Sequence, residues 1–286
     1  MREDIAAGIV LFNPNLERLE QNLKAVSGQV LKIFLIDNGS ENIHGIQQLL
    51  QEYSVCRLLR NEINKGVAVA LNQLMKEAEN NGYTWLLTLD DDSVCENGLV
   101  QKLSAFTERP DVGIICADAT DDSMTNSGSV NKHSIRSEKD GCECVESCIT
   151  AGSLTSIRAW KTIGGFDERM FIDFVDVEYC TRLRTYGYQI WKVAGTKVHQ
   201  QYGNISGHFH FLGKMYYLFN YPPIRIYYSV RNQIYYLKKH GKVICKSRQL
   251  FFLVGYVGKR IIFEKDRYKS LCAVIRGVKD GIRMRV

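Results

Sequence analysis

The stretch Trp85-Leu86-Leu87-Thr88-Leu89-Asp90-Asp91-Asp92 joins an apolar run to three successive carboxylates. Such a run predicts a buried β-strand, and ligands of open α/β sheets lie beyond the carboxyl ends of their strands. Side chains alternate along an extended chain, so we expect Asp90 and Asp92 on one face and Asp91 on the other. Two carboxylates on one side are typical ligands of Mg²⁺ or Mn²⁺. A solvated acidic turn is the alternative interpretation.

The segments before this stretch alternate between apolar runs and amphipathic patterns. Further strands are predicted at residues 5–12, 33–36 and 55–59, and helices at residues 16–26, 43–50 and 67–78. This alternation predicts an α/β fold with a mostly parallel central sheet and helices on both faces. The chain has no G-x-G-x-x-G after the first strand and no G-x-x-x-x-G-K-[ST]. A dinucleotide enzyme and a P-loop NTPase are therefore not expected.

Polar residues follow each of the predicted strands. They are Asn13, the pair Asp37-Asn38, the run Asn64-Lys65-Gly66, and the three aspartates. Parallel strands bring their carboxyl ends to one edge, so we expect a nucleotide to lie there, with Asp37 accepting from a base or a ribose. For Asp37 to Ser40 the alternative is turn chemistry, because Asn-Gly favours turns without any ligand.

A second group of carboxylates lies at residues 173–178. A helix is predicted to begin near Asp176, where an aspartate ordinarily caps the helix. The functional alternative is a general base that faces the site. Asp173 and Glu178 are close enough in sequence to raise the pKa of one member of the group.

Charge is divided unevenly along the 286 residues. Residues 224–286 contain 16 Lys and Arg against three Asp and Glu, a net charge of +13, whereas residues 1–223 carry −7. Aromatic residues are interleaved with the basic ones, which favours helices that lie on a membrane surface. RNA binding is the competing hypothesis, but no nucleic-acid-binding motif accompanies the charge. No apolar run approaches the roughly 20 residues of a membrane span.

The start of the chain, Met1-Arg2-Glu3-Asp4, lacks the features of a secretory signal. We therefore expect a cytoplasmic protein with nine reduced cysteines. A structural zinc at Cys142, Cys144 and Cys148 is an alternative, although these residues lack a matching second pair. Residues 118–143 are polar and predict a mobile loop, either an active-site flap or a surface insertion.

In their order along residues 5–200, the motifs resemble family-2 glycosyltransferases of the GT-A fold, and most of all the bacterial rhamnosyltransferases of surface polysaccharide synthesis. The matching segments are residues 10–14, 37–40, 64–66 with Asn72, 89–93, 152–153, 164–168, 171–182 and 198–199. Phe-Ile-Asp-Phe-Val-Asp at residues 171–176 is the piece that points to rhamnosyl transfer. Residues 228–232 look like the family's Arg-Asn motif.

The resemblance implies a role for each matching residue. Phe12, Asn13 and Asp37 would line the pocket of the nucleobase. The other residues of the donor site would be Asn38, Asn64, Lys65, Gly66, Asn72, Asp90, Asp91 and Arg231. Asp90, Asp92 and His199 would hold Mg²⁺ or Mn²⁺. Asp176 would be the general base, and Gly152 and Asp173 would bind the acceptor or a sugar. The chain departs from the family where the usual Glu before the base is Val175.

These roles describe an inverting glycosyltransferase with a catalytic domain at residues 1–215 and a basic, mainly helical segment at residues 216–286. A metal ion neutralises a leaving diphosphate, and a base takes the proton of the acceptor hydroxyl. The expected partners are dTDP-L-rhamnose, a lipid-linked oligosaccharide acceptor and the inner face of the cytoplasmic membrane, without nucleic acid. The alternatives are a UDP-hexose donor, a sugar nucleotidyltransferase, and a non-enzymatic membrane- or RNA-binding module.

Overall fold

The computed structural model describes residues 2–121, 141–200, 207–211, 214–219, 221–263 and 266–286. Its contacts divide the chain into two units. The first unit is Met1–Arg169 with Val175–Gln201, and the second is Met170–Phe174 with Tyr202–Val286. This division falls earlier than the boundary predicted after residue 215 and moves residues 170–174 into the second unit. Most of the loop predicted at residues 118–143 lies outside the described residues.

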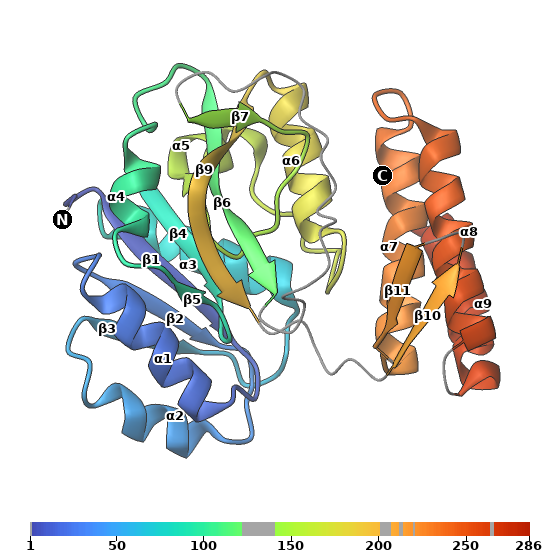
Figure 1. Ribbon diagram of the computed structural model, residues 1–286, viewed down its shortest axis with the longest axis horizontal. Helices are drawn as coiled ribbons and strands as arrows, with labels where there is room; N and C mark the ends of the chain where they lie inside the picture. The colour runs from blue at the N-terminus through green and yellow to red at the C-terminus, as the bar shows by residue number, and fades with distance from the viewer. Residues whose placement is uncertain (1, 122–140, 201–206, 212–213, 220, 264–265) are drawn as a thin grey trace. The chain divides into compact units, whose positions relative to one another are not determined.

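The first unit is built on a mixed β-sheet (Figure 1). The strands are β1 (Ile5–Leu11), β2 (Ile33–Asp37), β3 (Cys56–Arg60), β4 (Trp85–Asp90), β5 (Val94–Cys95), β6 (Val112–Asp121), β7 (Cys142–Cys144), β8 (Ser153–Ser156) and β9 (Gln189–Gln200). They lie in the order β3-β2-β1-β4-β8-β6-β9-β5, with β7 paired to β9. The strands β3, β2, β1 and β4 are parallel, as predicted. The sheet then continues through β8, which is antiparallel to β4 and β6.

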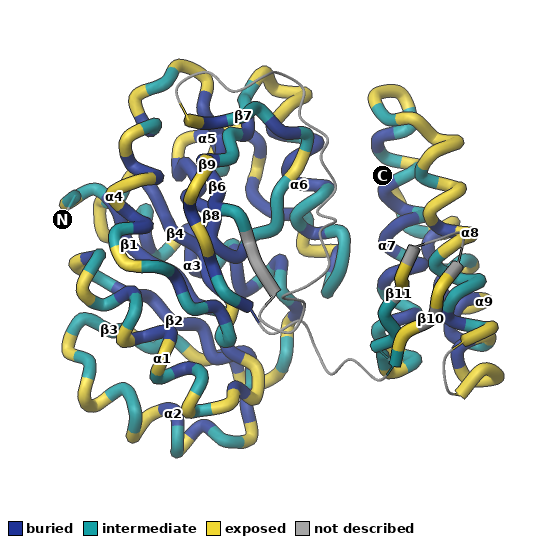
Figure 2. Tube along the Cα trace, in the orientation of Figure 1, coloured by how far each residue is buried: buried dark blue, intermediate teal, exposed yellow. Residues whose placement is uncertain are grey.

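Helices cover both faces of this sheet. They are α1 (Leu16–Ser27), α2 (Ile43–Leu50), α3 (Val67–Asn80), α4 (Leu99–Ser104), α5 (Ile157–Ile163) and α6 (Val175–Thr185). On one face Ile9 of β1 shares a buried core with Leu23 of α1. On the other face a Cβ at Gly8 would lie 3.3 Å from Leu74 of α3, so this helix packs closely on β1. Figure 2 shows that the central strands are buried along most of their length.

The strand register brings polar residues to one edge. Leu11 of β1 pairs with Asp37 of β2, and Val10 pairs with Asp90 of β4. The predicted meeting of the polar strand ends is therefore confirmed. However, β4 ends at Asp90, and the Ser93 backbone N donates to the Asp90 carbonyl oxygen at 3.1 Å. A turn orients the two following aspartates, so the alternation used to predict their directions applies only as far as Asp90.

The second unit is mainly helical, as the sequence predicted. Its elements are β10 (Gly207–Phe211), β11 (Lys214–Leu218), α7 (Pro223–His240), α8 (Lys246–Phe263) and α9 (Arg267–Arg283). Helices α7 and α9 approach closely at two glycines. A Cβ at Gly277 would lie 2.8 Å from the Tyr227 carbonyl oxygen, and one at Gly281 would lie 2.7 Å from that of Arg231. Within the described ranges, no helix combines the length and apolar character needed to cross a bilayer.

Candidate active site

Four carboxylates form one acidic group in the first unit. Asp90, Asp91 and Asp92 lie at the end of β4, and Asp176 in the first turn of α6 is close enough to act on Asp90. Asp90 keeps an exposed side, but protein atoms partly desolvate its carboxyl. Its pKa is raised to about 7, first by this desolvation and then by the charges of Asp92, Asp91 and Asp176. Desolvation, followed by the charge of Asp92, raises the pKa of Asp91 to about 6.

Such an acidic group suits a divalent cation. Carboxylate oxygens are hard ligands, and a cation would relieve the mutual repulsion that the raised pKa of Asp90 reflects. Over the described ranges, no group of three His, Cys, Asp or Glu side chains is arranged to hold a metal, and this includes Cys142, Cys144 and Cys148. Water and a diphosphate would have to complete the coordination, as is usual for Mg²⁺.

Two side chains of α1 hold the backbone around the aspartates. Arg18 donates to the carbonyl oxygens of Asp92 at 2.7 Å and His199 at 3.0 Å. Asn22 is fully buried and donates to the Asp90 carbonyl oxygen at 2.8 Å. These bonds fix the turn without using its carboxylates. The sequence reasoning missed both residues, although a signal was present. Asn22 interrupts the buried apolar stripe of α1.

The end of β9 also reaches the aspartates, through a residue that the sequence reasoning missed. Gln200 donates from Nε2 to Asp90 Oδ2 at 3.1 Å and to Ser93 Oγ at 3.0 Å. Adjacent side chains of a strand point to opposite faces, so His199 is expected to point away from Asp90. Strand alternation therefore does not support contact between His199 and this carboxylate, and the role of His199 as a metal ligand stays a prediction.

Asp176 lies close to the start of α6, which begins at Val175, one residue from the predicted position. A negative charge in the first turn is favourable because of the helix dipole. Glu178 is fully buried and accepts from Arg182 Nε at 2.7 Å and Nη2 at 2.8 Å. Arg182 compensates the charge of Glu178, and Asp176 acts electrostatically on Asp90 at the end of β4.

Asp173 belongs to the second unit, where its carboxylate is paired. It accepts from the Ser229 hydroxyl, and Oδ1 lies 3.3 Å from Arg225 Nη2. Both partners come from α7. The structure thus places Asp173 in a contact between the segment 170–174 and α7, and its role in binding an acceptor or a sugar stays a prediction.

Asn232 supports the same segment from α7. It is fully buried and donates to the carbonyl oxygens of Ile172 at 2.7 Å and Asp173 at 3.0 Å. The φ angles of Asp173 and Phe174 are 62° and 64°, a region that costs non-glycine residues energy. Arg231 donates to Asn232 Oδ1 at 2.8 Å. The predicted Arg-Asn motif therefore stabilises a strained loop, while contact between Arg231 and a donor stays a prediction.

The loops after β2 and β3 bring together several residues predicted to bind the donor. Asn38 Nδ2 donates to Asn64 Oδ1 at 2.9 Å, and Asn38 Oδ1 accepts from the Lys65 backbone N at 3.1 Å. The backbone N of Gly66 also donates to Asn64 Oδ1 at 2.9 Å. Gly39 allows the close approach of the loops, because its φ is 86° and a Cβ would lie 2.9 Å from the Ile63 backbone.

Asp37 lies beneath this edge rather than on its surface. It is fully buried, accepts from the Ser40 backbone N at 3.0 Å and lies 3.3 Å from Arg60 Nε. This environment leaves the carboxylate no exposed surface. The structure favours a role in shaping the loop, and the direct contact with a base stays a prediction.

Phe12 and Asn13 occupy the end of β1. Phe12 is 48% exposed, and its backbone N donates to Asp91 Oδ2 at 3.5 Å. An exposed aromatic ring beside the aspartates is a surface on which a base can stack. Asn13 Oδ1 accepts from the Glu41 backbone N at 2.8 Å and so ties the first loop to the second.

Asn72 of α3 holds the loop at residues 164–168. Its Oδ1 accepts from Trp160 Nε1 at 2.9 Å and from the Phe166 backbone N at 2.8 Å, and its Nδ2 donates to Glu168 at 2.9 Å and to the Phe166 carbonyl oxygen at 3.0 Å. The amide group is fully used by these contacts. They give Asn72 a role in positioning the loop, and its predicted contact with the donor remains untested.

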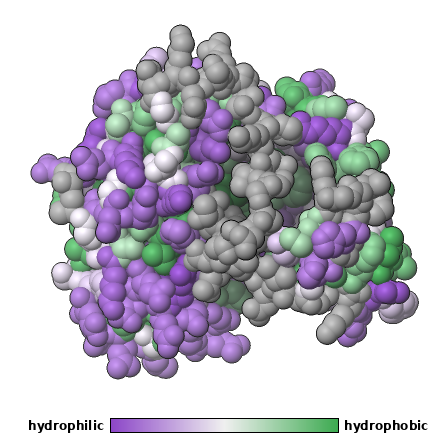
Figure 3. Space-filling view, in the orientation of Figure 1, coloured by the Kyte–Doolittle hydropathy of each residue, from purple (hydrophilic) through white to green (hydrophobic). Residues whose placement is uncertain are grey.

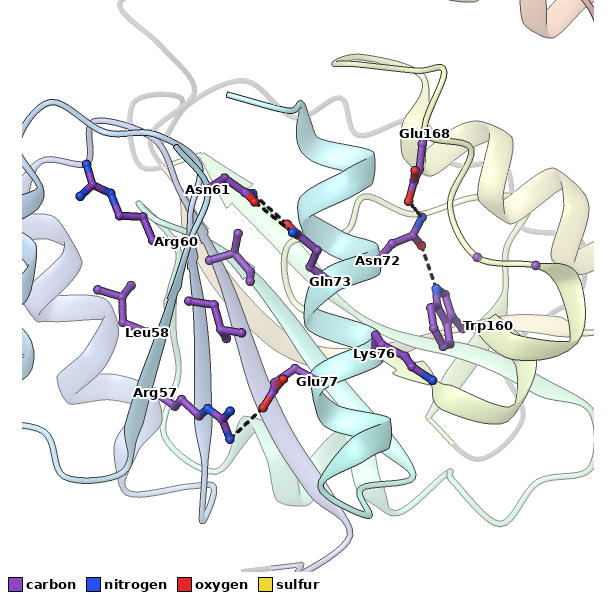
Figure 4. A pocket seen from close by; sticks show the side chains of 14 residues that line it. Arg57, Leu58, Arg60, Asn61, Asn72, Gln73, Lys76, Glu77, Trp160 and Glu168 are labelled. Carbon is purple, nitrogen blue, oxygen red and sulfur yellow. Dashed lines mark hydrogen bonds and ion pairs between the residues drawn. The ribbon is translucent and has the colours of Figure 1, made fainter. Parts of the chain in front are cut away.

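A pocket of about 730 Å³ lies beside α3, and Asn72 and Glu168 line it (Figure 4). Its charged side chains include the pair Arg57 and Glu77, with Nη1 and Oε1 2.9 Å apart. None of the four clustered aspartates lines this pocket. We therefore place the candidate active site at the aspartates, where the negative charges lie together.

Gly152 has a structural requirement for glycine. Its φ is 77°, and a Cβ would lie 2.7 Å from Val198 Cγ2. Its backbone N donates to the Thr88 carbonyl oxygen at 2.8 Å. The residue thus allows the chain to pass closely between β4 and β9, while its predicted contact with an acceptor stays untested.

The central sheet, its covering helices and the acidic end of β4 define a GT-A protein. Residues 7–171 match the family described as "Glycosyl transferase family 2". The chain belongs to this family.

The chain is similar over almost its whole length to "dTDP-rhamnosyl transferase RfbF" of Shigella flexneri. The identity is 25% over 295 residues, covering 99% of this chain and 97% of the relative. Two solved structures share the fold. GalNAc-T7 with UDP, GalNAc and Mn²⁺ has a TM-score of 0.60 at 14% identity, covering 85% of this chain but only 51% of its own. S. aureus TarS 1–349 with UDP-GlcNAc has a TM-score of 0.55 at 12% identity, covering 98% and 81%.

Proposed function

We propose that the protein is an inverting, metal-dependent glycosyltransferase that transfers L-rhamnose from dTDP-L-rhamnose to a lipid-linked oligosaccharide. The observation that carries the proposal is the group of Asp90, Asp92 and Asp176, in a chain similar to a dTDP-rhamnosyl transferase over nearly its full length. The product would serve the synthesis of a surface polysaccharide, such as O-antigen, capsule or cell wall.

Asp90 and Asp92 are the residues that would hold Mg²⁺ or Mn²⁺. The bound ion would neutralise the charge that develops on the leaving diphosphate. The fit rests on the donor set, because both side chains supply hard oxygens and lie among further negative charges. Phe12 and the loops after β2 and β3 would bind the nucleoside beside this site.

Asp176 would take the proton of the acceptor hydroxyl as the hydroxyl oxygen attacks the anomeric carbon. The base lies in the first turn of α6, within electrostatic reach of Asp90. A carboxylate within hydrogen-bond distance contributes about 10²–10⁴-fold. Attack opposite the leaving diphosphate inverts the anomeric carbon in one displacement and needs no covalent intermediate.

The second unit would contact the cytoplasmic face of a membrane. Helix α8 exposes a set of large apolar side chains, namely Leu250, Phe251, Phe252, Val254 and Ile262. Helix α9 exposes Tyr268, Ile275 and Ile282. Figure 3 shows hydrophobic and hydrophilic residues interleaved on the visible face of this unit. Apolar side chains combined with a net charge of +13 over residues 224–286 favour a surface of anionic lipids.

Calorimetry with a panel of donors tests the proposal. The protein is titrated with dTDP-L-rhamnose, UDP-galactose and UDP-glucose, each in the presence of Mn²⁺. We expect heat of binding with dTDP-L-rhamnose. Heat of binding with a UDP-hexose, and none with dTDP-L-rhamnose, would show that the donor is a UDP-hexose and not dTDP-L-rhamnose.

The variant Asp176→Asn tests the assignment of the base. We expect transfer to fall by about 10²–10⁴-fold because the proton acceptor is lost, while calorimetric binding of the donor persists. The control is Glu108→Gln, whose side chain is 86% exposed outside the acidic group. Full transfer activity in Asp176→Asn would show that another group is the base.

A further inference from the structure

We propose that Gln200 is a positioning residue that orients the Asp90 carboxylate for the metal and diphosphate, an inference that rests on the proposed function. Gln200 is the last residue of β9 and is 3% exposed. Its Nε2 reaches both Asp90 Oδ2 at 3.1 Å and Ser93 Oγ at 3.0 Å. One side chain therefore joins the end of β9 to the turn that follows β4.

These contacts close a ring of hydrogen bonds around the turn. The Asp90 backbone N donates to Ser93 Oγ at 3.2 Å, and the Ser93 backbone N donates to the Asp90 carbonyl oxygen at 3.1 Å. Gln200 completes the ring by binding both side chains. A carboxylate that is bound by Gln200 and stands on a turn closed by hydrogen bonds keeps one orientation, which a metal ligand requires.

The other end of the Gln200 amide argues against a role in packing alone. Gln200 Oε1 is buried and accepts no hydrogen bond from the residues that the structure describes. A buried carbonyl oxygen without a donor costs about 1–3 kcal/mol. An apolar side chain of similar size would avoid this cost, so glutamine at this position contributes its two N–H donors at the expense of stability.

An uncharged hydrogen-bond donor is well suited to the position of Gln200. Asp90 lies among the charges of Asp91, Asp92 and Asp176. A Lys or Arg in place of Gln200 would bind the Asp90 carboxylate more strongly, but it would also cancel charge that attracts a cation. The amide group orients the carboxylate and leaves its charge in place.

The variant Gln200→Leu tests the proposal through Mn²⁺ binding in the presence of dTDP, measured from the electron paramagnetic resonance signal of free Mn²⁺. We expect the apparent affinity to fall by about tenfold, as for other residues that orient metal ligands. The thermal midpoint without metal should change little, because removal of the unpartnered Oε1 offsets the loss of the two bonds from Nε2. The control is Gln189→Leu at the other end of β9, for which neither quantity should change.

Gln200→Asn keeps the amide but shortens its reach by one methylene, so it should also weaken Mn²⁺ binding. Wild-type affinity in either variant overturns the proposal. A lower thermal midpoint that accompanies the loss of affinity in both variants also overturns it, because that pattern indicates a structural role. If Gln200→Leu does not fold, Gln200→Asn decides. A wild-type protein that binds no Mn²⁺ with dTDP or UDP would instead refute the proposed function, so the two failures are distinguishable.

Discussion

At the scale of single residues, some side chains of the site supply negative charge and others bind the backbone around it. The four aspartates supply the charge. Arg18 and Asn22 bind carbonyl oxygens of the turn instead of carboxylates. Because the bonds from Arg18 and Asn22 end on the backbone, they support the turn without occupying its acidic oxygens.

This division predicts different effects within the aspartate turn. Asp92→Asn should abolish measurable Mn²⁺ binding with dTDP, because the variant lacks one of the two proposed ligands. Asp91→Asn should change the affinity by less than about tenfold, because Asp91 Oδ2 is directed at the Phe12 backbone N, 3.5 Å away. Titration followed by the free Mn²⁺ signal measures both. A larger loss in Asp91→Asn than in Asp92→Asn would make Asp91 the main ligand.

Sequence patterns located the acidic residues but not their supports. Asp90 stands out because three successive carboxylates follow an apolar strand, and Asp176 stands out because it ends the segment Phe-Ile-Asp-Phe-Val-Asp. Asn22 and Gln200 are ordinary amides in a helix and a strand, and their partners lie 68 and 110 residues away along the chain. Their importance becomes visible only when the fold brings these partners to them.

At the scale of elements, the segment 170–174 is held by α7 at the point where the chain is about to enter α6. Asn232 binds two of its carbonyl oxygens, and Asp173 is bound by Ser229 and Arg225. Two successive residues with positive φ are tolerated only where the surroundings compensate their cost. The contacts with α7 provide this compensation, just before the proposed base at Asp176.

Asn232→Ala should therefore destabilise the protein. The change leaves the carbonyl oxygens of Ile172 and Asp173 without their donor in a partly buried setting, which costs up to about 1–3 kcal/mol for each group. Chemical denaturation measures the loss, with Lys242→Ala on the exposed turn after α7 as the control. An unchanged free energy of unfolding in Asn232→Ala would mean that the loop does not depend on this clamp.

The elements themselves were predicted unevenly. The strands β1, β2 and β4 were found because each is a continuous apolar run between amphipathic helices. The antiparallel pairings of β8 were not, because Trp85 meets Ser156 only through contacts remote in sequence. The same reason explains why the sequence did not assign residues 170–174 to the second unit.

At the scale of the whole molecule, net positive charge and exposed apolar side chains are concentrated in the second unit. Residues 224–286 carry +13, and α8 exposes Phe251 to 74%. A basic surface with exposed aromatic rings combines electrostatic attraction to anionic lipids with insertion of apolar groups. The proposed contact with a membrane therefore belongs to a different unit from the clustered aspartates.

Phe251→Glu should weaken binding to vesicles that contain phosphatidylglycerol, because it places a negative charge in the apolar face of α8. Co-sedimentation measures the bound fraction, which should also fall with added salt in the wild-type protein. Ile63→Glu is a matched control, since Ile63 is 69% exposed but belongs to the first unit. Equal vesicle binding by wild type and Phe251→Glu would exclude this face of α8.

The assignment of residues 170–174 to the second unit has a consequence for hybrid proteins. A hybrid that joins residues 1–201 of this chain to the C-terminal part of a relative would separate Asp173 from the α7 side chains matched to it. The strained loop at residues 170–174 would then have to bind α7 side chains that come from the relative. A hybrid that transfers residues 170–174 together with residues 202–286 keeps the matched set intact. The exchangeable module of this protein is therefore discontinuous in the chain.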